Sequence, residues 1–580
     1  MRTLPFVLLA LTLSAFAQKE KLAPDTIYVN GNIYTGTRVE TCGGKPCWEG
    51  ILRAQAMAVS GDRILSVGTD GEIKGLKGSK TKVVDLGGRF VMPGFNDAHL
   101  HFAAGGLEKT RVNLIGVKSL EEMKARIAAA AKNLQPGEWI AGRGWDQTLW
   151  ASQKLPSRYD IDDVTGDHPA FFSRVDGHAA LVNSAALKAR GITKQTPNPR
   201  GGSYSRDSNG DLTGIVREAV WDQFYESLPK PSLAQRRRGI ELAMEEAREW
   251  GLTSAQDSIT AEDDPAEWDD FLLYEELERE GKLTVRITRW LPFNAPLDAL
   301  NKYRDHHPQD DPMLHTGMVG EVYLDGSLGS RSAALLAPYS DDPKNSGITR
   351  LDQETLNRRT VERVLAGFQL GFHAIGDRGA QMALDAIAQA ELSFNWRKQN
   401  ASQGRRGDQL RFRIEHAQVI DLSQISQFAQ LGVIASVQPC HLLTDMQWAE
   451  SRLGPERAKN SYPWRSFLAQ GVRLAFGTDF AVEPMNPFRG LYAAVTRKSE
   501  DGKQTYHAEQ ALTIDEAIQA YTSGSAYAEF AEREKGQLAP GMLADFIVLD
   551  RDITRVPPEE LLRTRVLQTY MGGKQVFARR

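Results

Sequence analysis

Two histidines stand two residues apart in FNDAHLHF, residues 95–102, directly after an apolar run at residues 91–94. Side chains alternate with a period of two along a strand, so His99 and His101 are expected to point to the same side. Two neutral imidazoles on one face make half of a binding site for Zn²⁺ or a similar ion. The pair alone is weak evidence, and it gains weight from polar residues later in the chain.

Five later positions carry side chains that bind metals or move protons, and each lies near the end of a strand-like run. Glu321 and Asp325 lie in GEVYLDGSLGSRSAAL, His373 in FHAIGDRG, His416 in RIEHAQ and Asp479 in FGTDF. One such histidine alone is more often a hydrogen-bonded core residue, and one such aspartate is commonly a helix N-cap. In a (β/α)8 barrel, however, all strand ends meet at one mouth, so distant residues can surround one ion. As a set, these residues predict a metal enzyme.

The composition is that of an ordinary globular protein. The chain has 580 residues, of which 41% are hydrophobic and 25% charged, and this is ample for a large core. Seventy Lys and Arg residues against 74 Asp and Glu residues give a formal net charge of −4. Because no basic run is long enough to favour nucleic acid, we expect a small-molecule substrate and no nucleic-acid partner.

Residues 1–17, MRTLPFVLLALTLSAFA, have the pattern of a signal peptide, with Arg2, an apolar run and a small-residue cleavage site ending at Ala17. The apolar run is too short to span a bilayer, and no other segment is a transmembrane candidate. We therefore expect an exported protein, periplasmic or secreted, with no membrane span.

The chain has three cysteines. Cys42 and Cys47 flank the turn-forming stretch Gly-Gly-Lys-Pro and could close a disulfide loop in an oxidising compartment, two free thiols being the alternative. Cys440 is left over in VQPCH. We do not expect it to be a nucleophile, because no base that would lower its pKa is identifiable.

Both ends of the mature chain are rich in short β-like runs separated by turn signals. This pattern predicts one small β domain built from residues 18–92 and 536–580. Residues 93–535 alternate helical and buried strand patterns, with capping-box sequences such as the one that begins at Ser232. Such alternation predicts a parallel sheet, open or closed into a barrel. Residues 145–230 lack a sustained period and are interpreted as an insertion.

Nine sequence motifs follow one another along the chain: PGFNDAHLH, GWD at 144–146, DGHAALVNSAAL, DGSLGSRSAAL, HAIGDRG, EHAQ, SVQP, GTDF and PGMLADFIVLD. In this order they resemble the amidohydrolase superfamily, and most of all the amidohydrolase-3 branch that contains N-substituted formamide deformylase. The resemblance covers nearly all of the mature chain. It implies an α/β fold, a distorted (β/α)8 TIM barrel with a small β-sandwich domain formed from both chain termini.

The resemblance also implies a centre for one or two divalent ions, Zn²⁺ above all, bound by His99, His101, His373, His416 and Asp479. The first two histidines and the aspartate would hold the more buried ion, and the other two histidines a second one. In this branch a carboxylated lysine usually bridges the ions, but Glu321 occupies the matching position. Glutamate presents a carboxylate on an arm shorter by about 3–4 Å. Glu321 therefore bridges after a closer approach of the backbone, leaves a site for one ion, or lies off the metal.

Catalytic roles follow from the same resemblance. Zn²⁺ lowers the pKa of a bound water to about 7 and polarises a substrate carbonyl. Asp479 would accept a proton from the attacking water and deliver it to the leaving nitrogen. His178 would donate a hydrogen bond to the carbonyl oxygen, unless it only caps the following helix. Four further residues are expected to shape the substrate pocket: Trp145, Asp146, Arg331 and His441.

These features together predict an exported metal-dependent amidohydrolase that hydrolyses an amide, N-formyl or cyclic amide bond of a small molecule. One alternative keeps the site but changes the bond, to an ester or a lactone. Another is a binding protein that kept the barrel and lost its activity. A homodimer is the default expectation for the oligomeric state, and the fold itself does not determine the substrate.

Overall fold

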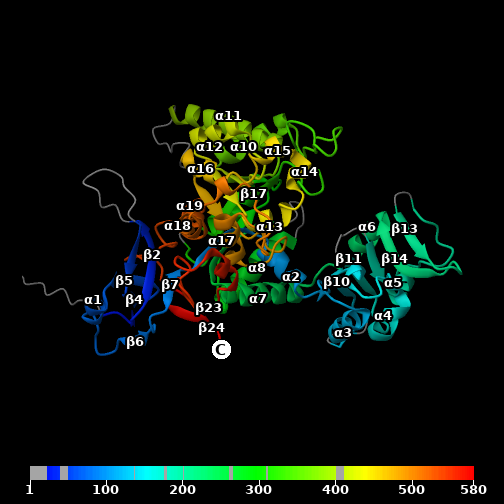
Figure 1. Ribbon diagram of the computed structural model, residues 1–580, viewed down its shortest axis with the longest axis horizontal. Coiled ribbons are helices and arrows are strands. Elements are labelled where there is room, and N and C mark those ends of the chain that lie inside the picture. Colours follow the sequence, from blue (N-terminus) through cyan, green and yellow to red (C-terminus); the bar gives the residue numbers. More distant parts are fainter. Residues whose placement is uncertain are drawn as a thin grey trace, which may run out of the picture.

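The computed structural model describes residues 23–38, 50–132, 134–135, 137–174, 179–199, 202–259, 266–308, 311–399 and 410–580. The expected signal peptide, the Cys42 and Cys47 pair and His178 lie outside these described residues. A β-rich unit, a central barrel and a smaller α/β unit lie side by side in Figure 1. Within the described ranges, no helix has both the length and the apolar character needed to cross a membrane.

The central unit is a barrel of parallel strands in the order β21-β20-β19-β18-β17-β16-β15-β8. The strands are β8 (Phe95–Leu100), β15 (Leu252–Asp257), β16 (Arg286–Leu291), β17 (Leu314–Tyr323), β18 (Leu370–Ala374), β19 (Arg413–His416), β20 (Ile434–Val437) and β21 (Leu474–Phe476). Nearly all of their residues are buried, as is typical of parallel strands that are covered on both faces. The predicted distorted (β/α)8 barrel is confirmed.

Hydrogen bonds close the seam between the first and last strands of the barrel. The Asp97 carboxylate accepts from the backbone N–H and hydroxyl of Thr478, at 2.9 and 2.6 Å. The backbone N–H of Asp479 donates to the carbonyl of His99 at 2.8 Å. These bonds fix two of the predicted metal-binding residues relative to each other.

Helices surround the barrel (Figure 1). The helix predicted after Ser232 is α7, which begins at a capping box formed with Gln235 and ends at Gly251 with φ +80°, a conformation that glycine adopts without strain. The longer helices are α7 (Leu233–Trp250), α8 (Ala266–Arg279), α9 (Leu297–His306), α10 (Gln353–Leu365), α11 (Asp377–Gln399), α12 (Leu422–Leu431) and α17 (Pro487–Thr496). Shorter ones are α2 (Phe102–Glu108), α13 (Cys440–Asp445), α14 (Ala449–Leu453), α15 (Pro455–Ala458), α16 (Trp464–Ala469), α18 (Ile514–Gln519) and α19 (Ser525–Ala528).

Two sheets form the β-rich unit, in the orders β5-β4-β1-β6 and β24-β23-β22-β7-β2-β3. Strand β7 pairs with β22 in antiparallel register, Val91 opposite Val548, so both ends of the chain build one sheet. The N-terminal strands are β1 (Thr26–Val29), β2 (Asn32–Arg38), β3 (Ile51–Ala54), β4 (Ala56–Ser60), β5 (Arg63–Gly68), β6 (Lys82–Asp85) and β7 (Phe90–Pro93); α1 (Asp70–Lys74) lies among them. The C-terminal strands are β22 (Phe546–Leu549), β23 (Val566–Met571) and β24 (Lys574–Ala578).

The smaller α/β unit is inserted after α2 and has a sheet of the order β13-β14-β12-β11-β10-β9. Its strands are β9 (Val112–Asn113), β10 (Ile140–Trp145), β11 (Ala170–Arg174), β12 (Ala179–Val182), β13 (Gly202–Arg206) and β14 (Leu212–Glu218). Its helices are α3 (Leu120–Ala131), α4 (Arg158–Thr165), α5 (Ser184–Ala189) and α6 (Ala219–Glu226). The insertion thus begins at β9, before the predicted residue 145. The sequence does not reveal this start, because β9, α3 and β10 have the same strand–helix pattern as the barrel.

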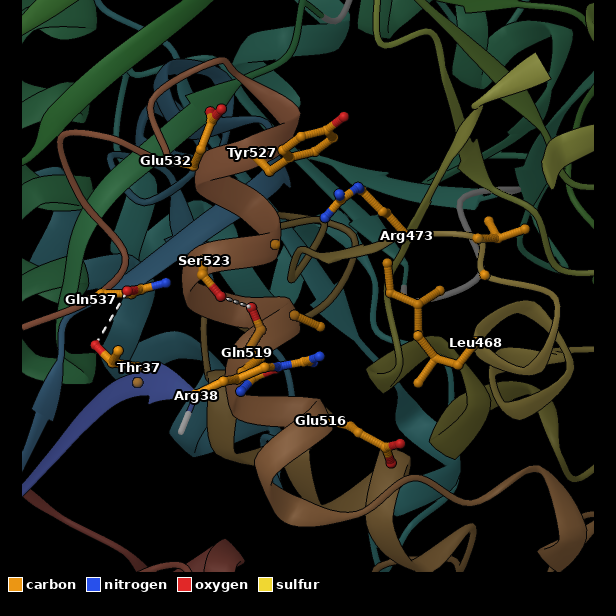
Figure 2. Close-up of a pocket in the computed structure, with 16 residues that line it drawn as sticks. Thr37, Arg38, Leu468, Arg473, Glu516, Gln519, Ser523, Tyr527, Glu532 and Gln537 are labelled. Carbon is orange, nitrogen blue, oxygen red and sulfur yellow. Dashed lines mark hydrogen bonds between the residues drawn. The ribbon is translucent and has the colours of Figure 1, made fainter. Parts of the chain in front are cut away.

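A cavity of about 780 Å³ lies between the β-rich unit and the barrel (Figure 2). Arg473, which lines it, directly precedes β21, whereas Asp479 follows that strand. The cavity therefore lies at the end of β21 opposite the predicted metal centre. Its wall includes Arg38, which donates to the amide oxygen of Gln519 at 2.9 Å.

A buried ion pair joins the barrel to the C-terminal strands of the β-rich unit. Arg286 donates from Nε and Nη2 to the Asp545 carboxylate at 2.6 and 2.9 Å, and both side chains are 4% exposed. Asp545→Ala leaves a buried guanidinium unpaired, so the free energy of unfolding should fall by about 3–5 kcal/mol in urea denaturation. Glu534→Ala removes only a half-exposed partner of Arg63 and should cost less than about 1 kcal/mol. Equal losses in the two variants would contradict this role.

Candidate metal centre

Strand β8 and the end of β21 bring two histidines and an aspartate together. His99 Nε2 lies 3.6 Å from Asp479 Oδ1, and His101 Nε2 lies 3.3 Å from the same oxygen. All three side chains are buried. His101 follows the last residue of β8, and its backbone N–H donates to the carbonyl of Phe480. Asp479 adopts φ +54°, so its side chain leaves the direction that strand alternation would give it.

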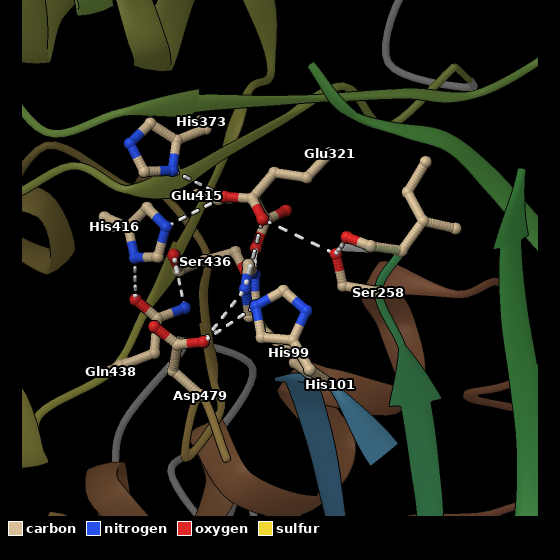
Figure 3. A network of polar contacts seen from close by, with 12 residues as sticks. His99, His101, Ser258, Glu321, His373, Glu415, His416, Ser436, Gln438 and Asp479 are labelled. Carbon is tan, nitrogen blue, oxygen red and sulfur yellow. Dashed lines mark hydrogen bonds and ion pairs between the residues drawn. The ribbon is translucent and has the colours of Figure 1, made fainter. Parts of the chain in front are cut away.

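The adjacent strands β17, β18 and β19 contribute a second group, centred on Glu321 (Figure 3). Glu321 Oε1 lies 2.8 Å from His373 Nδ1 and 2.8 Å from His416 Nε2. The other oxygen, Oε2, lies 3.5 Å from His99 Nε2. One buried carboxylate therefore faces three imidazoles that belong to three different strands.

Groups behind the histidines decide which ring nitrogen carries the proton. His99 Nδ1 lies 2.8 Å from Glu415 Oε2, and His416 Nδ1 lies 2.8 Å from Gln438 Oε1. Because both oxygens only accept, each Nδ1 donates its proton, which leaves each Nε2 as the ring nitrogen that would bind a metal ion. The rings are thus preset as ligands.

Glu415 is a functional residue that the sequence reasoning missed. Arg413 donates to it from Nε at 2.8 Å and from Nη2 at 3.2 Å, so the carboxylate behind His99 is itself held in place. The available signal was the pair Arg413 and Glu415, two residues apart in the buried strand β19. Two opposite charges in a buried strand require partners in the interior.

The charges of the cluster compensate one another. Burial alone would raise the pKa of Glu321, but the facing His99 and His373 imidazoles hold that pKa well below its usual range. Burial likewise opposes ionisation of Asp479, and His101, His441 and His99 together keep its pKa well below the ordinary value. Both carboxylates are therefore ionised at neutral pH and can act as ligands.

The residues present fit a metal centre. Four buried atoms of the cluster have no hydrogen-bond partner among the described residues: His99 Nε2, His101 Nδ1, His441 Nε2 and Asp479 Oδ1. Buried polar atoms are rarely left unpaired unless a ligand or ion satisfies them. Ligand atoms of His99, Glu321 and His416 lie within 4.8 Å of one another, as do those of His99, His101 and Asp479. Imidazole nitrogens with carboxylate oxygens are a donor set that suits Zn²⁺.

His441 lies within this cluster rather than at its edge. Its Nε2 is 3.0 Å from Asp479 Oδ2, and its Nδ1 is 3.0 Å from the amide nitrogen of Gln418. Because that amide nitrogen donates, Nδ1 accepts and the Nε2 proton faces Asp479. Cys440 beside it is buried with its thiol towards the carbonyl of Thr478. Burial raises the pKa of this thiol well above its usual value, which suits an inert side chain.

The remaining pocket residues of the sequence analysis lie elsewhere. Trp145 is buried in the core of the inserted unit and donates from its indole to the carbonyl of Phe172 at 2.7 Å. Asp146 pairs with Arg174 at 3.1 Å, and Arg331 pairs with Asp341 at 2.9 Å. None of the three predicted side chains lines the cavity next to the metal centre, and their contact with substrate stays a prediction.

That cavity has a volume of about 620 Å³ and lies between the barrel mouth and the inserted unit. His101 and Tyr323 line it from the barrel, together with Ala481 and Val482, which follow Asp479. The inserted unit contributes charged and aromatic side chains, Arg143, Arg174, Phe171, Trp221 and Tyr225 among them. A small molecule in this cavity would contact the metal centre through the face of His101.

A parallel-stranded barrel with imidazoles and carboxylates at one mouth is the arrangement of a metal-dependent hydrolase. The chain is similar to an uncharacterized metal-dependent hydrolase of Pyrococcus horikoshii, with a TM-score of 0.71 and 28% identity over 92% of this chain and 99% of that one. Residues 82–577 match the model of the Amidohydrolase family. The chain therefore belongs to the amidohydrolase family and is a metal-dependent hydrolase that acts on carbon–nitrogen bonds.

Two relatives match the chain over almost its whole length. Protein LONG AFTER FAR-RED 3 of Arabidopsis thaliana is 32% identical over 98% of this chain and 94% of its own. N-substituted formamide deformylase of Arthrobacter pascens is 27% identical over 95% of this chain and 97% of its own. The likeness to an amidohydrolase branch that contains this deformylase is thereby confirmed.

The carboxylate behind His99 should govern metal affinity. Glu415→Gln replaces an acceptor that holds the His99 Nδ1 proton, and loss of such a partner typically weakens metal binding about 10- to 100-fold. Titration of metal-free protein with Zn²⁺ against a competing chelator measures the change. Glu276→Gln, on the surface of α8, is the matched control and should bind as the parent protein does. An affinity unchanged in Glu415→Gln would show that this carboxylate does not position the ligand.

Proposed function

We propose that this protein is an exported hydrolase that cleaves the amide bond of a small N-acyl compound at a centre for two divalent ions, foremost Zn²⁺. The observation that carries the proposal is the position of Glu321. Its Oε1 lies 2.8 Å from both His373 Nδ1 and His416 Nε2, while its Oε2 lies 3.5 Å from His99 Nε2. A carboxylate that faces two sets of histidines in this way has the arrangement of a bridge between two ions.

The proposed ligand sets follow from these contacts. One ion would be held by His99, His101 and Asp479, and the other by His373 and His416, with Glu321 shared between them. When bound, such ions act as Lewis acids towards a carbonyl oxygen and turn water into a nucleophile at neutral pH. The shorter arm of Glu321 does not prevent the role, because its oxygens already reach the histidines of three strands.

Asp479 would move the proton. Its low pKa keeps the carboxylate ionised, and an ionised carboxylate next to the attacking water can accept a proton from it. The water oxygen then bonds to the carbonyl carbon, the carbon–nitrogen bond breaks, and the nitrogen leaves as an amine with the proton that Asp479 returns. His441, 3.0 Å from Asp479 Oδ2, would keep the carboxylate oriented. His178 is proposed to donate a hydrogen bond to the carbonyl oxygen.

The amide substrate is supported by the relative from Arthrobacter pascens, whose name describes the deformylation of N-substituted formamides. The cavity of about 620 Å³ beside His101 has a volume suited to a small organic molecule. A protein that had kept only the barrel would not need His99 Nε2 and Asp479 Oδ1 to be buried without a hydrogen-bond partner among the described residues. Export is supported by the signal-peptide pattern of residues 1–17.

Removing the proton acceptor should stop turnover without removing the metal. Asp479→Asn keeps an oxygen ligand but lacks a basic carboxylate, so kcat should fall about 10²- to 10⁴-fold, measured with an N-formyl amide and Zn²⁺-loaded enzyme. Elemental analysis of the same sample should find the parent metal content. Asp501→Asn, on the surface, controls for the substitution itself. A variant at position 479 that turned over at the parent rate would mean that another group moves the proton.

A further inference from the structure

A bulge in β10 decides which side chains of the inserted unit face the active-site cavity. Residues Ala141 and Arg143 line the cavity from β10, opposite Phe171 and Ser173 on β11. The register shifts after Arg143, where Gly144 adopts φ +97°, a conformation that suits glycine. Alternation is interrupted there, so the next side chain, that of Trp145, enters the core on the other face. The arginine is therefore the last side chain that this strand presents to the cavity before the bulge.

Among the arginines that line the cavity, Arg143 is the one for which the described residues provide no partner. Arg111 donates to Glu108 at 2.6 Å, and Arg174 donates to Asp146 at 3.1 Å, so both of these charges are compensated. For the Arg143 guanidinium, the described part of the chain provides neither a hydrogen bond nor an ion pair. An arginine fork matches a carboxylate in a bidentate manner. The cavity thus offers an unused binding group for an anion.

Three aromatic rings form a wall beside this arginine. Trp221 and Tyr225, one turn apart on α6, stack at 5.0 Å with an interplanar angle of 8°. Phe171 lies 5.9 Å from the Trp221 ring, and the Trp221 indole donates to the Ser173 hydroxyl at 3.1 Å. These contacts hold the rings in place, so a planar apolar group can pack against them without reordering the wall.

The same cavity reaches the metal centre from the barrel side, through His101 and Tyr323. The Tyr323 ring lies 4.9 Å from the ring of His373, which belongs to the other proposed ligand set. A substrate in the cavity can therefore place its amide at the barrel mouth while the rest of it lies against the inserted unit. The unit supplies two kinds of contact, one anion-binding and one aromatic.

We propose that the substrate is an N-acyl aromatic amino acid whose carboxylate is bound by Arg143. This inference rests on the proposed amide hydrolysis and adds the class of amine that leaves. The acyl carbonyl lies at the metal centre, the carboxylate at Arg143, and the aromatic side chain against Phe171, Trp221 and Tyr225. Hydrolysis then releases the acyl group as a carboxylic acid and the aromatic amino acid as the amine.

Two substrates that differ only in the carboxylate test the assignment: N-formylphenylalanine and N-formylphenethylamine. Arg143→Gln should raise KM for the first about 10- to 100-fold with little change in kcat, because a charge-assisted hydrogen bond made equally in the ground and transition states is lost. The KM of the second should change by at least tenfold less. Arg143→Lys keeps the charge and should recover part of the affinity. Equal effects on both substrates, or no effect on the first, would overturn the proposal.

Arg126→Gln is the matched control, because it removes the same charge from α3 of the inserted unit, where Arg126 pairs with Glu122. Its kinetic constants should equal those of the parent. If the metal-loaded parent hydrolyses neither amide, the proposed function fails, and calorimetric binding of N-acetylphenylalanine then judges the subsite separately. Binding that is lost in Arg143→Gln supports the subsite, whereas equal binding, or none by the parent, overturns it.

Discussion

The charges of the carboxylates and imidazoles that are buried at the barrel mouth must compensate one another. The rest of the site depends on this constraint. Glu321 and Asp479 are 1% and 3% exposed, and a buried charge without a partner is costly. Each carboxylate accordingly faces several imidazoles. Some buried atoms of the cluster still lack a partner among the described residues, and its ligand atoms lie within 4.8 Å of one another in groups that could hold a cation. The cluster therefore fits a bound metal ion.

The barrel strands hold the residues of this cluster in place, and the surrounding polar groups orient the imidazole rings. Hydrogen bonds across the seam of β8 and β21 tie Asp97 to Thr478, which places the two ends of the strand order side by side. Behind the histidines, Arg413 and Glu415 fix the ring of His99. The inserted unit then covers the mouth with a wall of its own. We propose that the barrel carries out catalysis and that the inserted unit selects the substrate, as loops and insertions on a fixed scaffold allow.

Much of this arrangement could be predicted from the sequence, because strand ends of a parallel barrel converge whatever their separation in the chain. That rule gathers His99, Glu321 and Asp479 without any knowledge of their contacts. It does not predict the direction of Trp145, which depends on a bulge at a single glycine. Nor does it find the start of the insertion, because the sequence of a short strand such as β9 does not show which sheet the strand joins. Local backbone irregularity and sheet membership are set by tertiary packing.

The most direct test of a two-ion centre bridged by Glu321 is metal stoichiometry, measured by elemental analysis of the purified protein beside Glu321→Ala. We expect about two divalent ions per chain in the parent, a number set by the two-ion arrangement, and fewer in the variant. One ion per chain in both proteins would contradict the bridge and place Glu321 off the metal. No ion in the parent would contradict the metal centre itself.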